Sequence, residues 1–100
     1  MAILTTYTRM PAVKAAVGMC ERSIYQLCAN GLLPQPVKLG RRASAWPSHE
    51  IEAVTAARAA GADDSAIRDL VKQLHAARAE RWANMQSTLA VPTAPTAVII

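Results

Sequence analysis

Phenylalanine is absent from this 100-residue chain, which holds only two tryptophans and two tyrosines. A large aromatic core is therefore excluded, and the abundant alanine favours helices with modest side chains. A chain of this length forms one domain, or a small domain with an appendage. The composition predicts an all-α or mostly α protein.

Long apolar runs are missing as well, and cysteine is scarce. No stretch approaches the roughly 20 apolar residues that span a bilayer, and no segment has the charged start and apolar run of a signal peptide. Cys20 and Cys28 would lie about 12 Å apart on one helix, beyond the reach of a disulfide. We therefore expect reduced thiols in a cytoplasmic protein that contacts no membrane.

Patterns typical of catalysis or metal binding are also lacking. His49 and His75 do not have metal-ligand spacing, and Glu50 and Glu52 have no acid, base or nucleophile arranged around them. A glycine-rich phosphate loop is absent. The sequence predicts no metal, no cofactor and no enzymatic activity.

What the chain does have is an uneven distribution of charge. Residues 1–60 carry seven basic and three acidic residues, whereas the four basic and four acidic residues of 61–100 cancel. All of the net charge of +4 therefore lies in the first part. This asymmetry indicates a polyanionic partner for that part.

Two short helices are predicted near the start of the chain. Pro11 suits the first turn of a helix over about 11–17, and Gly18 ends it. Cys20 takes the N-cap position of a second helix over 21–30, which ends at Asn30-Gly31. Two helices joined by a tight turn that contains glycine are typical of the helix-turn-helix motif. Residues 1–8 show no periodicity and are expected to form a frayed lead-in.

A hairpin and two further helices should follow. Val37–Leu39 and Ala43–Trp46 read as strands around the turn Gly40–Arg42, which makes a basic wing, and Trp46 is expected to anchor this hairpin in the core. Ser48 is a plausible N-cap for a third helix, which Gly61 closes. Asp63–Ser65 caps a long amphipathic helix over about 64–86. We expect a winged helix-turn-helix domain over 1–61, this helix as a dimerisation or packing element over 62–86, and a flexible tail over 87–100.

The stretch RMPAVKAAVGMCERSIYQLCANGLLPQPVKLGRRASAWPSHEIEAV resembles the AlpA family of phage regulators, which are relatives of phage excisionases with a MerR-like winged fold. The resemblance covers roughly residues 9–54. Three positions depart from the family pattern, which usually has serine for Cys20, a basic residue for Gln26 and an aromatic residue for Val54. The resemblance implies sequence-specific DNA binding, regulation of transcription and, often, control of the excision of integrated elements.

Double-stranded DNA is therefore the expected partner, and the chain is expected to be nucleoid-associated. Residues on the second helix should contact base edges and phosphates in the major groove, and residues on the wing should grip phosphates or the minor groove. The candidate DNA-binding residues are Lys14, Arg22, Ser23, Tyr25, Gln26, Lys38, Arg41 and Arg42.

The long helix leaves two interpretations open. Its apolar stripe could fold back onto the first three helices, or it could pair with the same helix of a second copy, and we favour a homodimer. The predicted dimerisation residues are Ile67, Leu70, Val71, Leu74 and Trp82.

Two alternative functions remain. One is an excisionase-type architectural factor that bends DNA and recruits a recombinase rather than the transcription machinery. The other is a protein-interaction adaptor that acts through the long helix, an interpretation that Gln26 in place of a basic residue supports.

Overall fold

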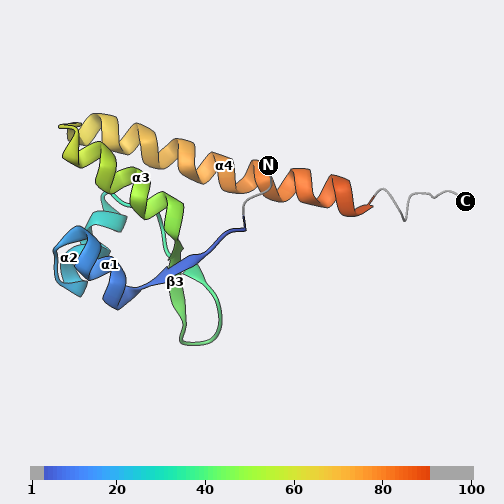
Figure 1. Cartoon of the computed structure of the whole chain (residues 1–100), viewed down its shortest axis with the longest axis horizontal. Coiled ribbons are helices and arrows are strands. Elements are labelled where there is room, and N and C mark those ends of the chain that lie inside the picture. Colours follow the sequence, from blue (N-terminus) through green and yellow to red (C-terminus); the bar gives the residue numbers. More distant parts are fainter. Residues whose placement is uncertain (1–3, 91–100) are drawn as a thin grey trace, which may run out of the picture.

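Four helices and one small sheet make up the computed structural model, which describes residues 4–90 (Figure 1). In chain order the elements are β1 (Tyr7–Arg9), α1 (Met10–Val17), α2 (Glu21–Ala29), β2 (Val37–Lys38), β3 (Ser44–Pro47), α3 (Ser48–Ala59) and α4 (Asp64–Ala90). The predicted fold class, a mainly α protein with a helix-turn-helix, a small hairpin and a long C-terminal helix, is confirmed.

The sheet has three antiparallel strands instead of the predicted two. Its order is β1-β3-β2, with Tyr7 opposite Pro47 and Val37 opposite Ala45. The expectation of a frayed lead-in over residues 1–8 is therefore wrong for Tyr7 and Thr8, which belong to β1. A strand of three residues whose partner lies nearly forty positions away leaves no alternating pattern to detect.

The start of α3 also differs from the prediction. Ser48 is the first helical residue, the N-cap position belongs to Pro47, and no side chain caps this end. The Ser48 hydroxyl lies 2.7 Å from the Thr8 hydroxyl. Ser48 therefore links α3 to β1 and does not cap its own helix.

All four helices and β3 contribute to a single hydrophobic core. Trp46 is fully buried, as predicted, and its indole N–H donates a 2.7 Å hydrogen bond to the Pro34 carbonyl. Burial of an aromatic ring with its polar atom satisfied is a strong anchor for a small domain. The remaining buried core residues are Val13, Ile24, Cys28, Leu32, Leu33, Ile51, Val54, Ile67 and Val71.

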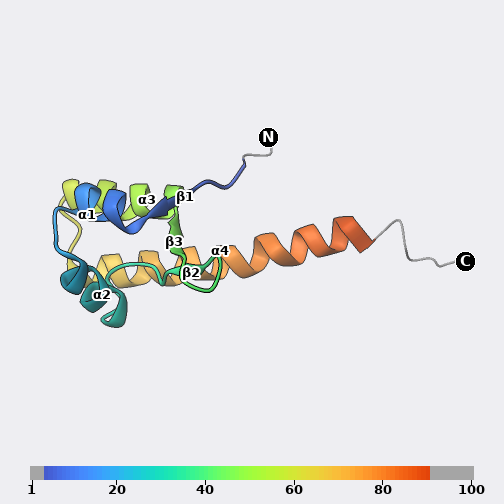
Figure 2. The ribbon, with the colours of Figure 1, turned by 90° about the horizontal axis from the view of Figure 1, so that it is seen from below.

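The helix α4 begins on the core and then extends past it. The Asp63 carboxylate accepts a 2.9 Å hydrogen bond from the Ala66 N–H, which confirms the predicted cap. Figures 1 and 2 show the first half of α4 beside α3 and the second half projecting alone. The helix runs to Ala90, so the predicted tail over 87–100 is wrong for residues 87–90. Residues 91–100 lie outside the described part of the chain.

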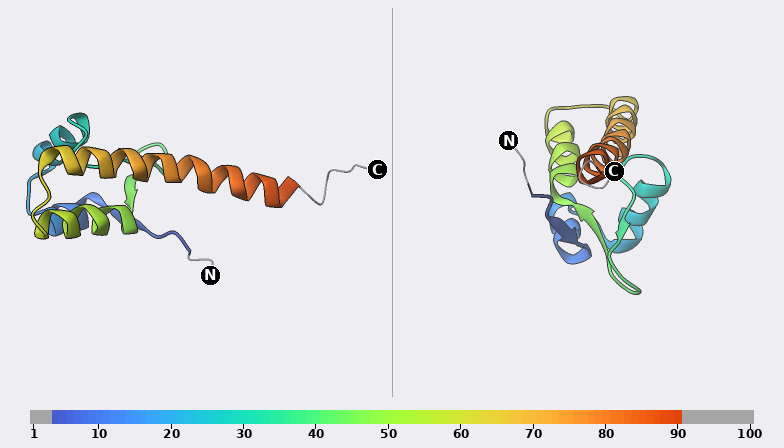
Figure 3. Two further views of the ribbon diagram at one scale, coloured as in Figure 1. Left: turned by 90° about the horizontal axis from the view of Figure 1, so that it is seen from above. Right: turned by 90° about the vertical axis from the view of Figure 1, so that its right-hand side faces the viewer.

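These elements place the hairpin and the two long helices on opposite sides of the core. In Figure 1 and in the right-hand view of Figure 3, α3 and α4 lie at the top and the tip of the β2–β3 hairpin points down. The short helices α1 and α2 flank the base of the hairpin. The surface that carries α2 and the hairpin tip is therefore not covered by α4.

Candidate nucleic-acid interface

The helix-turn-helix is formed by α1, a three-residue turn and α2. Gly18 ends α1 with φ 77°, in the left-handed region that glycine adopts without a steric penalty, and its N–H donates to the Lys14 carbonyl at 2.8 Å. Cys20 then takes the N-cap position of α2, but its side chain makes no capping hydrogen bond. The predicted motif and its turn are thus present.

The helix α2 has one buried and one exposed face. Ile24 and Cys28 are buried in the core, which leaves Arg22, Tyr25 and Gln26 on the exposed side. The structure brings these three predicted residues together on one surface. Ser23 differs, because it is half-buried and its hydroxyl lies 3.4 Å from the Cys20 sulfur. Ser23 is therefore tied to the turn.

Tyr25 connects the exposed face of α2 to the core. Its ring centroid lies 6.5 Å from that of Trp46, at an angle of 40° between the planes, although 44% of Tyr25 remains exposed. The sequence analysis did not predict this contact between a buried and a half-exposed ring. The contact fixes the orientation of the tyrosine ring beside the hairpin.

The predicted basic wing is the loop between β2 and β3. The Leu39 N–H donates a 2.8 Å hydrogen bond to the Ala43 carbonyl and so closes the turn. Arg41 and Arg42 in this loop and Lys38 at the end of β2 are all exposed. The strand β2 is one residue shorter than predicted, because Leu39 belongs to the loop, and β3 has the predicted length but begins and ends one residue later.

Among residues 4–90, the basic side chains on this side of the molecule make no ion pairs. By contrast, Arg58 of α3 pairs with Asp64 at 3.0 Å, and Arg78 of α4 pairs with Glu50 at 2.6 Å. Unpaired cations leave a positive potential that attracts a polyanion. The unpaired predicted residues are Lys14, Arg22, Lys38, Arg41 and Arg42.

Sequence reasoning missed how α4 fastens this surface to the core. The Arg68 Nε donates a 3.0 Å hydrogen bond to the Asn30 carbonyl, at the end of α2 where a cation is favoured by the helix dipole. His75 Nε2 accepts a 3.0 Å hydrogen bond from the Gln35 N–H, and Arg78 donates to the Gln35 carbonyl at 2.8 Å. Thus α4 holds both the end of α2 and the loop that leads to the wing.

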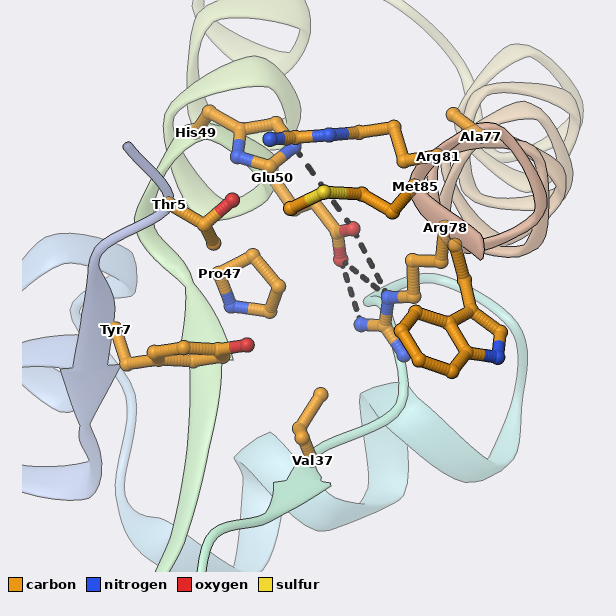
Figure 4. Close-up of a pocket in the computed structure, with 11 residues that line it drawn as sticks. Thr5, Tyr7, Val37, Pro47, His49, Glu50, Ala77, Arg78, Arg81 and Met85 are labelled. Atoms are coloured by element: carbon orange, nitrogen blue, oxygen red, sulfur yellow. Dashed lines mark hydrogen bonds and ion pairs between the residues drawn. The ribbon is translucent and has the colours of Figure 1, made fainter. Parts of the chain in front are cut away.

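A buried ion pair completes this attachment. Glu50 is only 1% exposed, and both of its carboxylate oxygens accept hydrogen bonds from Arg78 (Figure 4). In the sequence Arg78 merely interrupts the apolar stripe of the long helix, and Glu50 has no visible partner. A charged residue inside an apolar stripe was the signal that could have revealed the pair, because a buried charge needs a partner.

The predicted dimerisation residues have several different environments. Ile67 and Val71 are 0% and 3% exposed within the chain's own core, so the prediction that a partner covers them is corrected. Leu70 and Leu74 pack against the same core and are partly buried. Trp82 is 59% exposed on the projecting half of α4. The first half of the apolar stripe therefore packs in the chain's own core, whereas Trp82 in the second half remains exposed.

The two cysteines have contrasting environments. Cys20 is exposed, and the hydrogen bond with the Ser23 hydroxyl lowers the pKa of its thiol. Cys28 is buried, which raises the pKa of its thiol, and its S–H donates to the Pro34 carbonyl at 3.4 Å. Both are free thiols, and residues 4–90 contain no group of His, Cys, Asp and Glu side chains that could hold a metal ion.

Within the described part of the chain, no helix has the length and apolar character needed to cross a membrane.

Comparison with known proteins identifies the family. No curated protein and no solved structure shows significant similarity to the chain. The family described as prophage CP4-57 regulatory protein (AlpA) matches residues 6–58, a range that runs from β1 to near the end of α3 and includes the helix-turn-helix and the wing. The chain belongs to the AlpA family of prophage regulatory proteins.

Proposed function

We propose that the chain is a sequence-specific DNA-binding protein that regulates transcription within a prophage or another mobile element. The helix α2 enters the major groove, and the wing lies along the adjacent backbone. Arg22 and Gln26 have side chains that suit guanine and adenine edges, respectively, while Lys38, Arg41 and Arg42 neutralise phosphates.

One observation carries this proposal. Five basic side chains without an ion pair, Lys14, Arg22, Lys38, Arg41 and Arg42, belong to α1, α2 and the hairpin, on surfaces that α4 leaves uncovered. Arg58 of α3 and Arg78 of α4 are engaged in ion pairs, although Lys72 of α4 is not. An α-helix such as α2 has a diameter of about 10–12 Å with its side chains, which fits a major groove about 12 Å wide. Membership of a prophage regulatory family supports the same function.

The test is fluorescence-anisotropy titration of the full chain against a labelled duplex from the region upstream of its own gene. A scrambled duplex of equal length and composition is the matched control, and both are measured at two salt concentrations. We expect tighter binding to the upstream duplex and a steep loss of affinity with salt, because phosphate contacts release counterions. Absence of binding to either duplex would overturn the proposal.

A further experiment separates transcriptional regulation from an architectural role in excision. A reporter fused to the bound promoter should change its output when the chain is expressed. Binding that bends DNA in a gel assay without any effect on the reporter would favour the excisionase-type alternative.

A further inference from the structure

The second half of α4 exposes an apolar face that the domain does not cover. Trp82, Met85 and Leu89 are 59%, 58% and 65% exposed, respectively. Their spacing of three and four residues places them on one side of the helix. Large apolar side chains gathered on one exposed face are typical of an interaction surface.

The same segment is free of charge. Residues 82–90 contain no acidic or basic residue, although the exposed surface of the first part of α4 carries Arg68, Asp69, Lys72 and Glu80. Depletion of charge marks the centre of an interface. Asn84, Ser87 and Thr88 are also weak helix formers, and a short helical segment without packing is marginal in water. A partner that packs on the segment would stabilise its helical conformation.

An apolar groove lies at the base of this segment. It has a volume of about 360 Å³, and Tyr7, Val37 and Pro47 form one wall while Trp82 and Met85 form the other. Figure 4 shows Arg81 and Met85 extending from α4 across it. Glu50 and Arg78 at its floor neutralise each other. Arg81 also lines the groove, but its two walls are apolar and suit the apolar face of a helix.

We propose that the occupant is the same helix of a second copy, so that two chains pair about a two-fold axis. Each lays the α4 face formed by Trp82, Met85 and Leu89 against the groove of the other, so that Trp82 and Met85 of both chains meet near the axis. The exposed helix face and the groove lie on the same molecule, and both are apolar. A surface that can bind a copy of itself in this way is the condition for a self-complementary interface. The pairing goes beyond the proposed function and does not depend on DNA.

The exposed apolar face supplies part of the area that a stable dimer needs. Trp82, Met85 and Leu89 expose roughly 400 Å² of side chain, about half of the ~800 Å² that each partner contributes to a standard interface. The walls of the groove, including Tyr7 with 46% exposure, contribute further apolar surface. A dimer uses the distal half of α4, and the first half remains in the core of its own chain.

The first experiment measures the molar mass of the full chain by light scattering after gel filtration, without DNA. The wild-type chain should have twice its monomer mass of 10.7 kDa at about 100 µM, where a micromolar dimer is almost fully formed. Leu89→Glu should shift the mass to that of one chain, because it buries a carboxylate in an apolar contact. Ser87→Glu is the matched control, since it adds the same charge on the opposite side of the helix, and it should remain dimeric.

A second experiment tests the groove itself. Tyr7→Lys should also give a monomer, and an equimolar mixture of Tyr7→Lys with Leu89→Glu should recover dimers. In the mixed dimer one groove is native and the other joins a lysine to a glutamate. Far-UV circular dichroism of each variant confirms that the domain is folded, as expected for changes at exposed positions.

Three results would overturn the proposal. They are a wild-type chain that is monomeric at about 100 µM, equal loss of dimer in Ser87→Glu and Leu89→Glu, and a mixture that remains monomeric. The readout is mass in the absence of DNA, so failure of the DNA-binding proposal would leave these results unchanged.

Discussion

The guanidinium of Arg78, halfway along α4, forms a bidentate ion pair with the carboxylate of Glu50, in the first turn of α3. The same guanidinium donates to the Gln35 carbonyl in the loop before the wing. One side chain of the long helix therefore joins two separate parts of the family-matched region.

Arg78→Met should be strongly destabilising, because the buried Glu50 carboxylate loses its hydrogen bonds with the guanidinium. A broken buried pair costs about 3–5 kcal/mol of unfolding free energy, which urea denaturation followed by circular dichroism will measure. Arg58→Ala is the control, since its pair with Asp64 is exposed and should contribute about 1 kcal/mol or less. If the two variants lost similar amounts of unfolding free energy, the buried pair of Arg78 with Glu50 would stabilise the fold no more than the exposed pair does.

The stability of the fold should decrease as the pH falls below about 6.5. Burial, together with the neighbouring Arg78 charge, lowers the pKa of His75 from 6.5, while Glu50 acts in the opposite sense. The folded chain then binds fewer protons than the unfolded chain, so this contribution is complete above the unfolded pKa and is lost as the pH falls through the folded one. Protonated Nε2 could no longer accept the Gln35 N–H.

The measurement is the melting temperature of the wild type and of His75→Gln between pH 7.5 and 5. Glutamine keeps a hydrogen-bond acceptor but does not titrate, so the decrease should be smaller in the variant. If the melting temperatures of the two proteins fell equally with pH, His75 would be excluded as the source of the loss of stability.

Cys20→Ser should raise the melting temperature by a few degrees. The N-cap side chain of α2 makes no capping hydrogen bond, and serine is a far better cap than cysteine. Cys28→Ser is the matched comparison and should lower the melting temperature, because it replaces a buried sulfur with a more polar hydroxyl. A Cys20→Ser protein no more stable than the wild type would contradict this account of the cap.

Arg22→Ala should weaken binding to the specific duplex about tenfold or more and relax the preference for one base pair. Titrations against duplexes with single base-pair changes give both quantities. Glu21→Ala, a change of the neighbouring exposed residue, serves as the comparison and should not weaken binding. Unchanged preference in Arg22→Ala would remove this residue from base recognition.

Replacement of Arg41 and Arg42 together with alanine should weaken binding to specific and scrambled duplexes alike. Two lost phosphate contacts should reduce the slope of log affinity against log salt by roughly two. The control is Arg58→Ala with Lys72→Ala, which removes the same charge from α3 and α4. A slope that changes equally in both double variants would assign the effect to net charge and not to the wing.

Much of this fold was predictable because its signals are local. Pro11 and Gly18 delimit α1, Asn30-Gly31 ends α2, and the prolines before Val37 exclude a helix there. These residues act through their own backbone conformation, so single-sequence reasoning detects them. The exposed positions of Arg22, Tyr25 and Gln26 followed from the buried spacing of Ile24 and Cys28.

The features that the sequence did not predict depend on contacts between residues far apart in the chain. The strand β1 exists only through its pairing with β3, and the pair of Glu50 with Arg78 joins residues 28 positions apart. An amphipathic stripe also does not reveal which surface covers it, so Ile67 and Val71 were assigned to a partner when the chain's own core contains them. Tyr25 and Trp46 meet for the same reason, through the packing of α2 on the hairpin.

The attachment of α4 to Asn30, Gln35 and Glu50 has a consequence for modularity. A chimaera joined at the turn over 61–63 would give the winged part a foreign helix without matched residues for these three positions. A joint after Arg78 would carry every one of these contacts along and exchange only the projecting end. The unit that can be inherited or exchanged as one piece therefore ends within α4, well beyond the segment that defines the family.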